Sequence, residues 1–254
     1  MNASFDTVIG NHLIRQLPEV ERALLAPSLE PVALRDGQLL IDAGHAVRHV
    51  YFPTTAIVSL LSLQEDGATV ELAAVGNEGV AGLPALTGGE PMALRCEVQR
   101  TGRGLRISAA DLRALLPQLP GLQRLTMRYM QFLLTQIGAT AACIRHRPLM
   151  EQLCRWLLLS LDRVHGDELT VTQQRIANML GVRREGVTEA VARLESLHLI
   201  EHSRGRIRVI DRHGLEEISG ESYRIVQHEI RRLVQPRGAD VAPMVLKRAA
   251  ASAH

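Results

Sequence analysis

The chain of 254 residues is poor in aromatic side chains, which make up only 3% of it. Hydrophobic residues reach 46%, so any core must be aliphatic and built mainly from Leu, Val, Ile and Ala. Lysine occurs once, at Lys247, and nearly all positive charge is therefore arginine. The net charge of +2 is only mildly basic and does not by itself indicate a nucleic-acid partner, because nucleic-acid binding depends on local patches.

Cysteine and long hydrophobic runs are also scarce. Cys96, Cys143 and Cys154 lie far apart and form no Cys-x-x-Cys pair, which argues against a disulfide framework or an iron–sulfur site. The first residues lack the charged and apolar regions of a signal peptide. The richest apolar run, WLLLSL from Trp156, is too short to cross a bilayer. We therefore expect a cytoplasmic protein with no membrane partner.

Signatures of enzymes and metal sites are missing as well. The sequence contains no Gly-x-Ser-x-Gly and no phosphate loop that ends in Lys-Ser or Lys-Thr. His45 and His49 have i,i+4 spacing, but they fall in a stretch of turn and strand, so we interpret them as surface histidines. We expect no enzymatic activity, no metal and no cofactor, and an enzyme built on the N-terminal half is the weakest hypothesis.

The pattern of residues changes three times along the chain. After a short lead helix over 11–25, residues 31–107 alternate in short runs separated by turn sequences such as RDG, EDG and TGGEP, which predicts a β sandwich, barrel or roll. Helical patterns then follow over 121–146 and after Pro148. The sequence predicts an N-terminal helix with a β domain over 1–118, a long helix over 119–146, a second domain with a C-terminal helix over 147–234, and a flexible tail over 235–254.

The long helix has two apolar stripes. The first consists of Leu122, Tyr129, Phe132, Ile137, Ala139 and Cys143, and the second of Met130, Leu133, Ile137 and Ile144. Two stripes require two partners, so we expect one to pack on the β domain and the other on a second copy of the helix, which gives a homodimer. An ordinary buried helix within one domain is the alternative.

Residues 170–200, TVTQQRIANMLGVRREGVTEAVARLESLHLI, have the layout of a helix-turn-helix motif. Thr172 caps the first helix and Gly181 supplies the turn. The inward positions are Ile176, Met179 and Leu180 on the first helix, Val182 in the turn, and Val187, Val191 and Leu194 on the second. The next segment, HLIEHSRGRIRVID, predicts two strands and a polar turn, a β-hairpin wing with Arg206 and Arg208 on one face.

The exposed edge of the second helix, about residues 184–194, carries charge that packing does not require. Arg can bond O6 and N7 of guanine, and Glu can accept from the N4 amino group of cytosine. We expect base reading by Arg184, Glu185, Thr188 and Glu189. We expect phosphate contacts by Arg183, Thr172, Gln173, Arg204, Arg206 and Arg208. The alternative is that these residues form only a solvent-exposed first turn of mixed charge and bind no ligand.

Together these residues resemble the Crp/Fnr type of transcription regulator over about residues 20–211, most specifically in RREGV and LESLHLI. The resemblance implies an α+β fold: an N-terminal β-roll of the cyclic-nucleotide-binding kind (a jelly roll), a long dimerisation helix and a C-terminal winged helix-turn-helix. It implies a homodimer on palindromic double-stranded DNA, with RNA polymerase as a further partner. Arg184 and Glu185 match the base-reading Arg-Glu pair, and Glu189 replaces a frequent Arg.

The sensor half departs from the family. Its cyclic-nucleotide binders carry Gly-Glu-Leu-Gly, whose Glu holds the ribose, and an Arg-Ser pair for the cyclic phosphate. Here Gly79 and Gly82 bound the first motif, with Val80 in the place of Glu. Inward Leu94, Cys96 and Val98 leave Met92 and Ala93 in the places of Arg and Ser, with Arg95 facing outward. We expect no cyclic AMP binding in the usual mode and an effector of unknown identity, or none.

An alternative keeps the fold and changes the ligand site. In it, the β-roll binds cyclic AMP or cyclic di-GMP through a rearranged pocket that uses Glu78 or Arg95. The rearrangement requires a slip in strand register to turn Arg95 inward.

Overall fold

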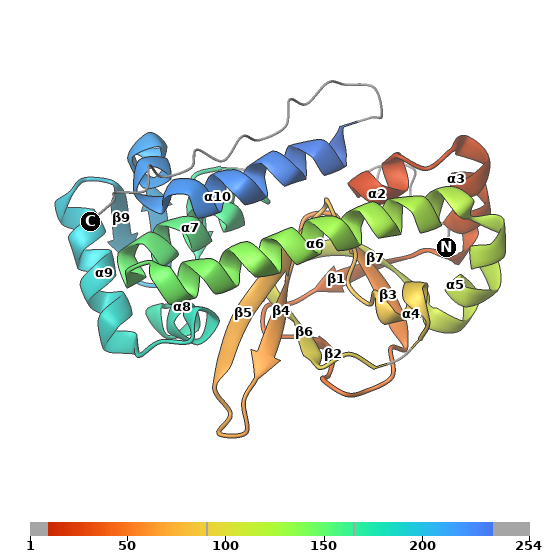
Figure 1. The fold of residues 1–254 in the computed structure, drawn as a ribbon, viewed down its shortest axis with the longest axis horizontal. Coiled ribbons are helices and arrows are strands. Elements are labelled where there is room, and N and C mark those ends of the chain that lie inside the picture. The colour runs from red at the N-terminus through yellow and green to blue at the C-terminus, as the bar shows by residue number, and fades with distance from the viewer. Residues whose placement is uncertain (1–9, 90, 165, 236–254) are drawn as a thin grey trace, which may run out of the picture.

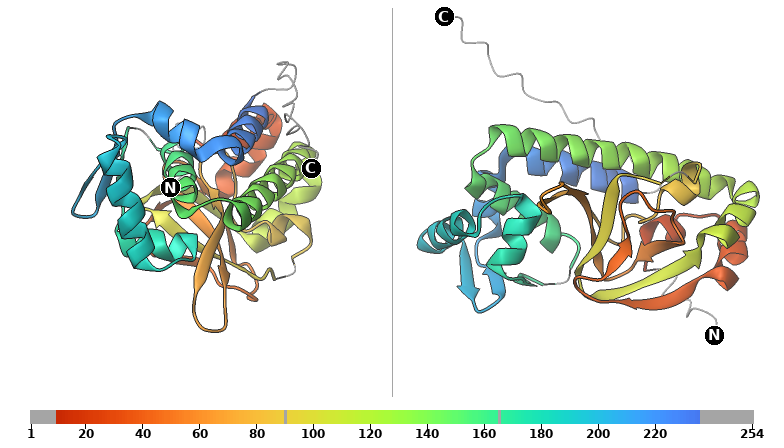
Figure 2. Two further views of the ribbon diagram at one scale, coloured as in Figure 1. Left: turned by 60° about the vertical axis from the view of Figure 1, so that its left-hand side comes forward. Right: turned by 90° about the horizontal axis from the view of Figure 1, so that it is seen from below.

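One long helix, α6 Pro120–His146, runs through most of the molecule and joins two halves of different structure (Figure 1). The structure is a computed structural model and describes residues 10–89, 91–164 and 166–235. The expected tail over 235–254 therefore lies outside the described residues except for Gln235. Strands of the N-terminal half lie against one side of α6, and a second long helix, α10 Arg212–Val234, lies beside it (Figures 1 and 2).

The N-terminal half is a two-sheet antiparallel roll. One sheet has the order β1-β7-β3 and the other the order β2-β6-β4-β5. The strands are β1 Glu30–Leu34, β2 Leu39–Ile41, β3 His49–Pro53, β4 Ile57–Leu63, β5 Thr69–Val75, β6 Leu94–Arg100 and β7 Gly102–Ser108. The short helices of this half are α4 Pro84–Thr87 and α5 Ala109–Leu115, and the 3-10 turns are η1 Ala26–Ser28 and η2 Leu116–Gln118. The α+β class with a β-roll is as predicted.

Strand β6 confirms the predicted alternation. Cys96 and Val98 are fully buried and Leu94 is half-buried, whereas Arg95 lies on the other face in an ion pair. Because successive side chains of a strand point to opposite faces, this register fixes which residues line the interior of the roll.

The lead segment corrects one prediction. The single lead helix over 11–25 is wrong: α2 His12–Arg15 and α3 Glu19–Leu25 are separate helices. Pro18 stands between them as the N-cap of α3, and proline disfavours a helical conformation for the residue before it. Asn11 caps α2 and its side-chain amide donates to the carbonyls of Pro53 and Gly79, both at 2.9 Å, which fastens the lead segment to the roll.

Helix α6 begins where its sequence favours a start. Pro120 takes the first position, where a missing N–H is not needed. The buried carboxylate of Glu21 accepts from the amides of Gly121 and Leu122 at 2.8 and 3.1 Å. A carboxylate is favoured there because the N-terminus of a helix carries partial positive charge.

Two sides of α6 are covered within one chain. The roll packs against Tyr129 and Gln136, and the Gln136 amide donates to the carbonyl of Ala74 at 3.1 Å. Helix α10 covers another side, which the sequence did not predict. Near the end of α10, Arg128 of α6 donates to the carbonyl of Arg232 at 2.8 Å.

A narrow apolar stripe of α6 stays exposed. We call it the α6 seam, and it consists of Met127, Met130, Leu134, Ala141 and Ile144. The spacing of three and four residues keeps these side chains on one face. Met130 and Ile144 were predicted for a second stripe, but Leu133 is buried inside the chain and the most exposed members are Met127 (69%) and Leu134 (70%).

The C-terminal half is a small winged domain. Its elements are α7 Leu149–Leu161, β8 Glu168–Thr170, α8 Gln173–Leu180, α9 Arg184–Ser196, β9 Ile200–Ser203, β10 Arg206–Val209 and α10. The strands form a sheet in the order β8-β10-β9, so the predicted hairpin gains a third strand. Asp211 caps α10, and Gly220, with φ 64° and ψ −145°, breaks the helix in its first half.

The two halves are joined by a buried ion pair. The guanidinium of Arg163, just after α7, lies 2.8 Å from the Glu78 carboxylate, and their side chains are only 2% and 3% exposed. Arg163 also donates to the carbonyl of Ala74 and to Oε1 of Gln136, both at 3.2 Å. The pair therefore ties the end of α7 to the roll and to α6 at once.

Candidate nucleic-acid interface

The α8–α9 corner has the geometry that its sequence predicts. Thr172 accepts from the amide of Arg175 at 3.2 Å and so caps α8. Gly181 ends α8 in the left-handed conformation, φ 67°, which favours glycine. The inward residues Ile176, Met179, Val187, Val191 and Leu194 are buried, and Leu180 and Val182 are half-buried. This packing leaves the first turn of α9 at the surface.

The predicted base-reading residues all lie on this exposed edge. Arg184, Glu185, Thr188 and Glu189 are exposed, and so is Arg183, which is predicted to contact a phosphate. In the described part of the chain, neither arginine has a carboxylate partner, so both guanidinium groups are open to a ligand. Thr188 is held instead: its hydroxyl donates to Oε1 of Gln173 at 2.8 Å, which links α9 to the start of α8.

The wing also has the expected faces. Ile207 and Val209 are buried, whereas Arg204, Arg206 and Arg208 are exposed. Arg208 pairs with Glu201 at 3.1 Å and Arg206 with Glu168 at 3.8 Å. Exposed pairs of this kind contribute little to stability and exchange readily for another anion. The wing arginines are therefore available to a phosphate backbone at small cost.

Helix α8 is docked on the roll, a feature that sequence reasoning missed. Arg175 bonds Glu97 of β6 at 2.7 Å and Asp36 at 3.1 Å, and donates to the carbonyl of Val98 at 2.8 Å. The Thr69 hydroxyl donates to the carbonyl of Asn178 at 3.1 Å. No local pattern identifies Arg175, because its partners come from a turn and a strand of the roll that are far away in sequence. These contacts fix the position of the helix-turn-helix relative to the sensor half.

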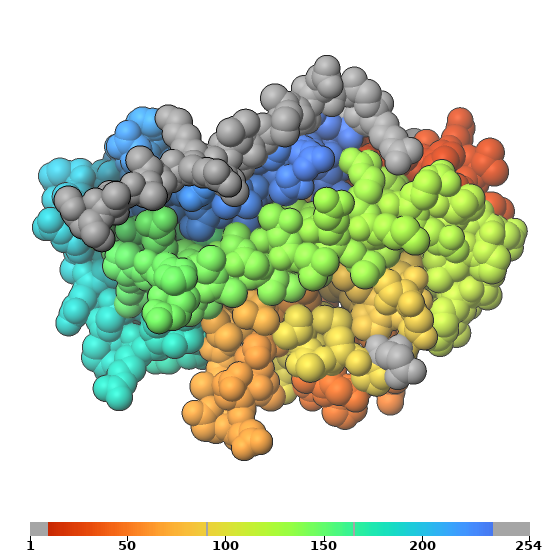
Figure 3. All heavy atoms as spheres, viewed as in Figure 1, coloured from red at the N-terminus to blue at the C-terminus, as the bar shows by residue number. Residues whose placement is uncertain are grey.

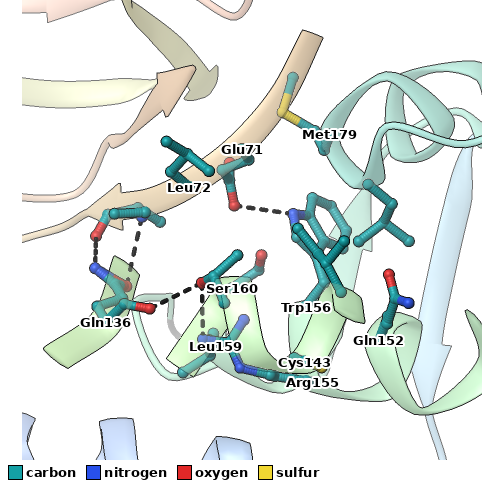
Figure 4. A pocket seen from close by; sticks show the side chains of 15 residues that line it. Glu71, Leu72, Gln136, Cys143, Gln152, Arg155, Trp156, Leu159, Ser160 and Met179 are labelled. Atoms are coloured by element: carbon teal, nitrogen blue, oxygen red, sulfur yellow. Dashed lines mark hydrogen bonds between the residues drawn. The ribbon is translucent and has the colours of Figure 1, made fainter. Parts of the chain in front are cut away.

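A small cavity of about 30 Å³ lies between the roll, α6, α7 and α8 (Figure 4). The carboxylate of Glu71, on β5, accepts from the indole N–H of Trp156 at 3.1 Å and from the Ser59 hydroxyl. Burial raises the pKa of Glu71 from its usual 4.5 to about 6, against the lowering effects of Ser59, Arg163 and Trp156. A titrating carboxyl thus lies where the two halves meet.

The residues that stand in the place of the family's two cyclic-nucleotide motifs, here called the cassette, are Gly79, Val80, Gly82, Met92 and Ala93. Packing leaves little open space around the first three. Gly79 lies directly under the ring of Tyr129, where a Cβ would collide with it, and Gly82 has φ 104°. Val80 is 2% exposed, Met92 is half-buried and Ala93 is exposed. Both glycines therefore have packing or backbone reasons to be glycine.

The two charged groups that a rearranged pocket would use already have partners. Arg95 bonds Asp42 at 2.9 Å, and burial of Glu78 against Arg163 leaves its carboxylate enclosed. Asp42 has its pKa lowered by the hydrogen bond from Arg95, as expected of an ionised partner. A ligand that recruits either side chain has to displace an ion pair first.

Comparison with known proteins identifies the class. The family model described as a cyclic nucleotide-binding domain matches residues 31–118, and that described as a Crp-like helix-turn-helix domain matches residues 151–218. Together they cover more than half of the chain, in the order of its two structural halves. The chain therefore belongs to the Crp/Fnr type of transcription regulator.

Solved structures share the fold at low sequence identity. A transcriptional regulator of the Crp/Fnr family from Eubacterium rectale is 18% identical, with a TM-score of 0.66 over 82% of this chain and 98% of that one. FixK2 from Bradyrhizobium japonicum is 18% identical, with a TM-score of 0.63 over 76% and 98%. The c-di-GMP responsive global regulator CLP of Xanthomonas campestris is 16% identical, with a TM-score of 0.59 over 75% and 97%.

No curated protein matches the chain in sequence. Within residues 10–89, 91–164 and 166–235, no helix combines the length and the apolar character that a membrane crossing requires.

The Glu71 carboxyl generates a prediction on stability. Because its pKa is higher folded than unfolded, protonation adds stability that is complete below about pH 4.5 and is lost as the pH rises through about 6. Glu71→Gln should abolish this loss, which amounts to at most about 2 kcal/mol. Urea unfolding of both proteins across that range, at one protein concentration, measures it.

The matched control is Glu65→Gln, in the exposed turn of the same hairpin. It removes the same charge without touching Trp156 and should keep the pH dependence of the wild type. An identical pH dependence in Glu71→Gln and the wild type would show that Glu71 ionises freely in the folded protein.

Proposed function

We propose that this protein is a dimeric, sequence-specific DNA-binding transcription regulator that reads its operator with α9, about residues 184–194. The observation that carries the proposal is an exposed Arg184, without a carboxylate partner among the described residues, beside Glu185 on a helix whose opposite face is buried. The families matched are transcription regulators, and we propose no enzymatic activity. The proposal includes a cytoplasmic location, RNA polymerase as a partner, and the division into domains given above.

Base reading falls to the first two turns of α9. Arg184 is assigned to guanine and Glu185 to cytosine, because their hydrogen-bonding groups match the major-groove edges of these bases. Glu189, one turn on, either accepts from a cytosine or selects against other bases. Thr188 reads a base only after its hydroxyl leaves Gln173.

Phosphate contacts surround this reading edge. Arg183 precedes α9, and Thr172 and Gln173 lie at the N-terminus of α8, where main-chain amides favour an anion. The wing supplies Arg204, Arg206 and Arg208. Such contacts set affinity and register and carry no sequence information.

The α6 seam supports the homodimer. Its most exposed members are Met127 and Leu134, and large apolar side chains at this spacing are typical of a helix that packs on a copy of itself. Two α9 helices in one dimer read two half-sites, so the operator is expected to be palindromic.

The sensor half is proposed not to bind cyclic AMP in the usual mode. Tyr129 fills the space over Gly79, and Met92 and Ala93 offer no cation to a phosphate. One observation favours a nucleotide in a rearranged pocket: the Tyr129 hydroxyl is buried and makes no well-formed hydrogen bond within the described part of the chain. The regulator named CLP above is described as responsive to c-di-GMP, which makes that nucleotide worth testing.

Arg184→Ala is the first test of base reading. Loss of a bidentate guanine contact should cost about 1–3 kcal/mol and relax specificity at one base pair. Operators selected from random DNA, then substituted position by position, measure both effects. Arg193→Ala, at the far end of the same exposed helix, is the control of equal charge. A uniform loss of affinity over all sequences would instead assign Arg184 to a phosphate.

Leu134→Glu tests the dimer. A buried carboxylate on each copy of the seam should convert the dimer to a monomer, as measured by sedimentation, and should remove preference for an inverted repeat. Val20→Glu, at an equally exposed apolar residue of α3 (73%), is the control and should leave the dimer intact. A Leu134→Glu protein that stays dimeric contradicts pairing through the α6 seam.

Calorimetry with cyclic AMP and cyclic di-GMP, with and without operator DNA, tests the sensor half. We expect no saturable heat from cyclic AMP. Saturable binding that disappears in Arg95→Gln would establish the rearranged pocket in place of our proposal, since Arg95 would then have left Asp42 for the ligand.

A further inference from the structure

A groove of about 610 Å³ lies at the end of α6 that is remote from α9. Three segments meet there: the lead helices, the first turns of α6 and the last turn of α10 (Figure 1). We call it the arginine groove, and the residues that matter for its chemistry are Arg15, Gln16, Arg124, Arg128 and Val234. Figure 3 shows α6 in green, with α10 in blue beside it and the lead helices in red at this end of the molecule.

The groove has an unbalanced positive charge. Arg15, Arg124 and Arg128 line it, and none of the described residues that line it carries a carboxylate. Within the described part of the chain, none of these arginines has a carboxylate within 4.0 Å. Arg128 donates only to the main-chain carbonyl of Arg232, and Arg15 contacts the ring of His12.

Neighbouring groups do not neutralise this charge. Burial, together with Arg15, lowers the pKa of His12, so its ring is neutral at physiological pH. The Glu21 carboxylate faces the amides of Gly121 and Leu122 and forms no ion pair with a groove arginine, and Glu229 pairs with Arg232 at 2.8 Å. The sequence over 236–254 contains a single acidic residue among several basic ones, so it does not complement the groove: Asp240 against Arg237, Lys247 and Arg248.

We propose that the arginine groove binds a small molecule that carries a diphosphate. Guanidinium groups bond phosphate oxygens in pairs and are the preferred side chains for that purpose. Arg124 and Arg128 are four residues apart on one helix face, hence neighbours, and Arg15 faces them from α2. Three guanidinium groups provide more hydrogen-bond donors than a single phosphate group needs. The volume of the groove suits a ligand of nucleotide size.

The site has a direct connection to the winged domain. Helix α10 starts at Arg212, three residues after the wing ends, and its last carbonyls accept from Arg128 and from the Gln16 amide at 3.0 Å. A diphosphate that engages Arg128 shares its guanidinium with the carbonyl of Arg232 and so constrains its position. Occupancy therefore changes how the end of α10 is held, and α10 packs along both α6 and α7. An effect on DNA affinity rests on the function proposed above.

Binding is tested on the full chain by calorimetry with inorganic pyrophosphate at physiological ionic strength. We expect saturable binding, weakened at least about tenfold in Arg124→Gln/Arg128→Gln, because two of three guanidinium groups are gone. Arg113→Gln, at an exposed arginine of α5 that has no ion pair with a described residue, is the control and should bind as the wild type does. Arg124→Gln alone, at a residue with no hydrogen bond or ion pair among those described, serves if the double variant fails to fold.

Further ligands identify what the groove selects. Inorganic phosphate should bind more weakly than pyrophosphate, and a nucleoside diphosphate at least as well as pyrophosphate. Equal binding of pyrophosphate by the double variant and the wild type would overturn the proposal. So would equal affinity of the wild type for pyrophosphate, phosphate and sulfate. Saturation by an acidic peptide with no response to pyrophosphate would assign the groove to a protein partner instead.

Operator affinity with and without pyrophosphate separates the two proposals. Pyrophosphate binding without any operator binding would support the diphosphate site and refute the proposed function as a DNA-binding regulator. Operator binding without pyrophosphate binding would refute the diphosphate site and leave the proposed regulator function intact.

Discussion

The buried Arg163–Glu78 pair holds the two halves of the molecule in one arrangement. Its members come from opposite sides of the junction, the turn after β5 and the end of α7, and Gln136 of α6 completes the network. Removing one partner of such a pair typically costs about 3–5 kcal/mol, because the other charge stays buried without compensation. Few alternative placements of α7 satisfy both charges. Together with the contacts of Arg175 on α8, this interaction sets the direction in which the winged domain leaves the sensor half.

Helix α6 packs against both halves of the molecule and so restricts how they can move relative to each other. The roll and α10 cover two of its sides, and the α6 seam is its exposed apolar face. A helix packed against the roll, α7 and α10 cannot rotate without disturbing all of them, because protein interiors are as dense as organic crystals. Changes at the seam, in the roll or under α10 are therefore not independent.

Much of this fold is predictable from sequence because it depends on local chemistry. Turn residues separate the strands of the roll, Gly181 marks the corner of the helix-turn-helix, and the exposed positions of Arg184 and Glu185 follow from helical periodicity. The pairing of these two side chains with bases rests on chemistry and remains a prediction. The features that sequence reasoning missed are long-range. Leu133 and Leu134 are adjacent and equally apolar, and only packing against segments distant in sequence decides which one is buried.

The sensor half and the reading edge are connected by two different kinds of contact. Docking of α8 depends on Arg175 and its carboxylates, which are partly exposed and responsive to ionic strength, whereas the neighbouring Glu71 responds to pH. The α10 connection depends on apolar packing and on main-chain carbonyls held at the arginine groove. The contacts of α8 connect the roll to α9, and α10 connects the arginine groove to the wing. The cassette is filled by Tyr129, whereas the groove is lined by three arginines and by no carboxylate of the described residues, so a ligand at the groove, as proposed above, has fewer contacts to displace.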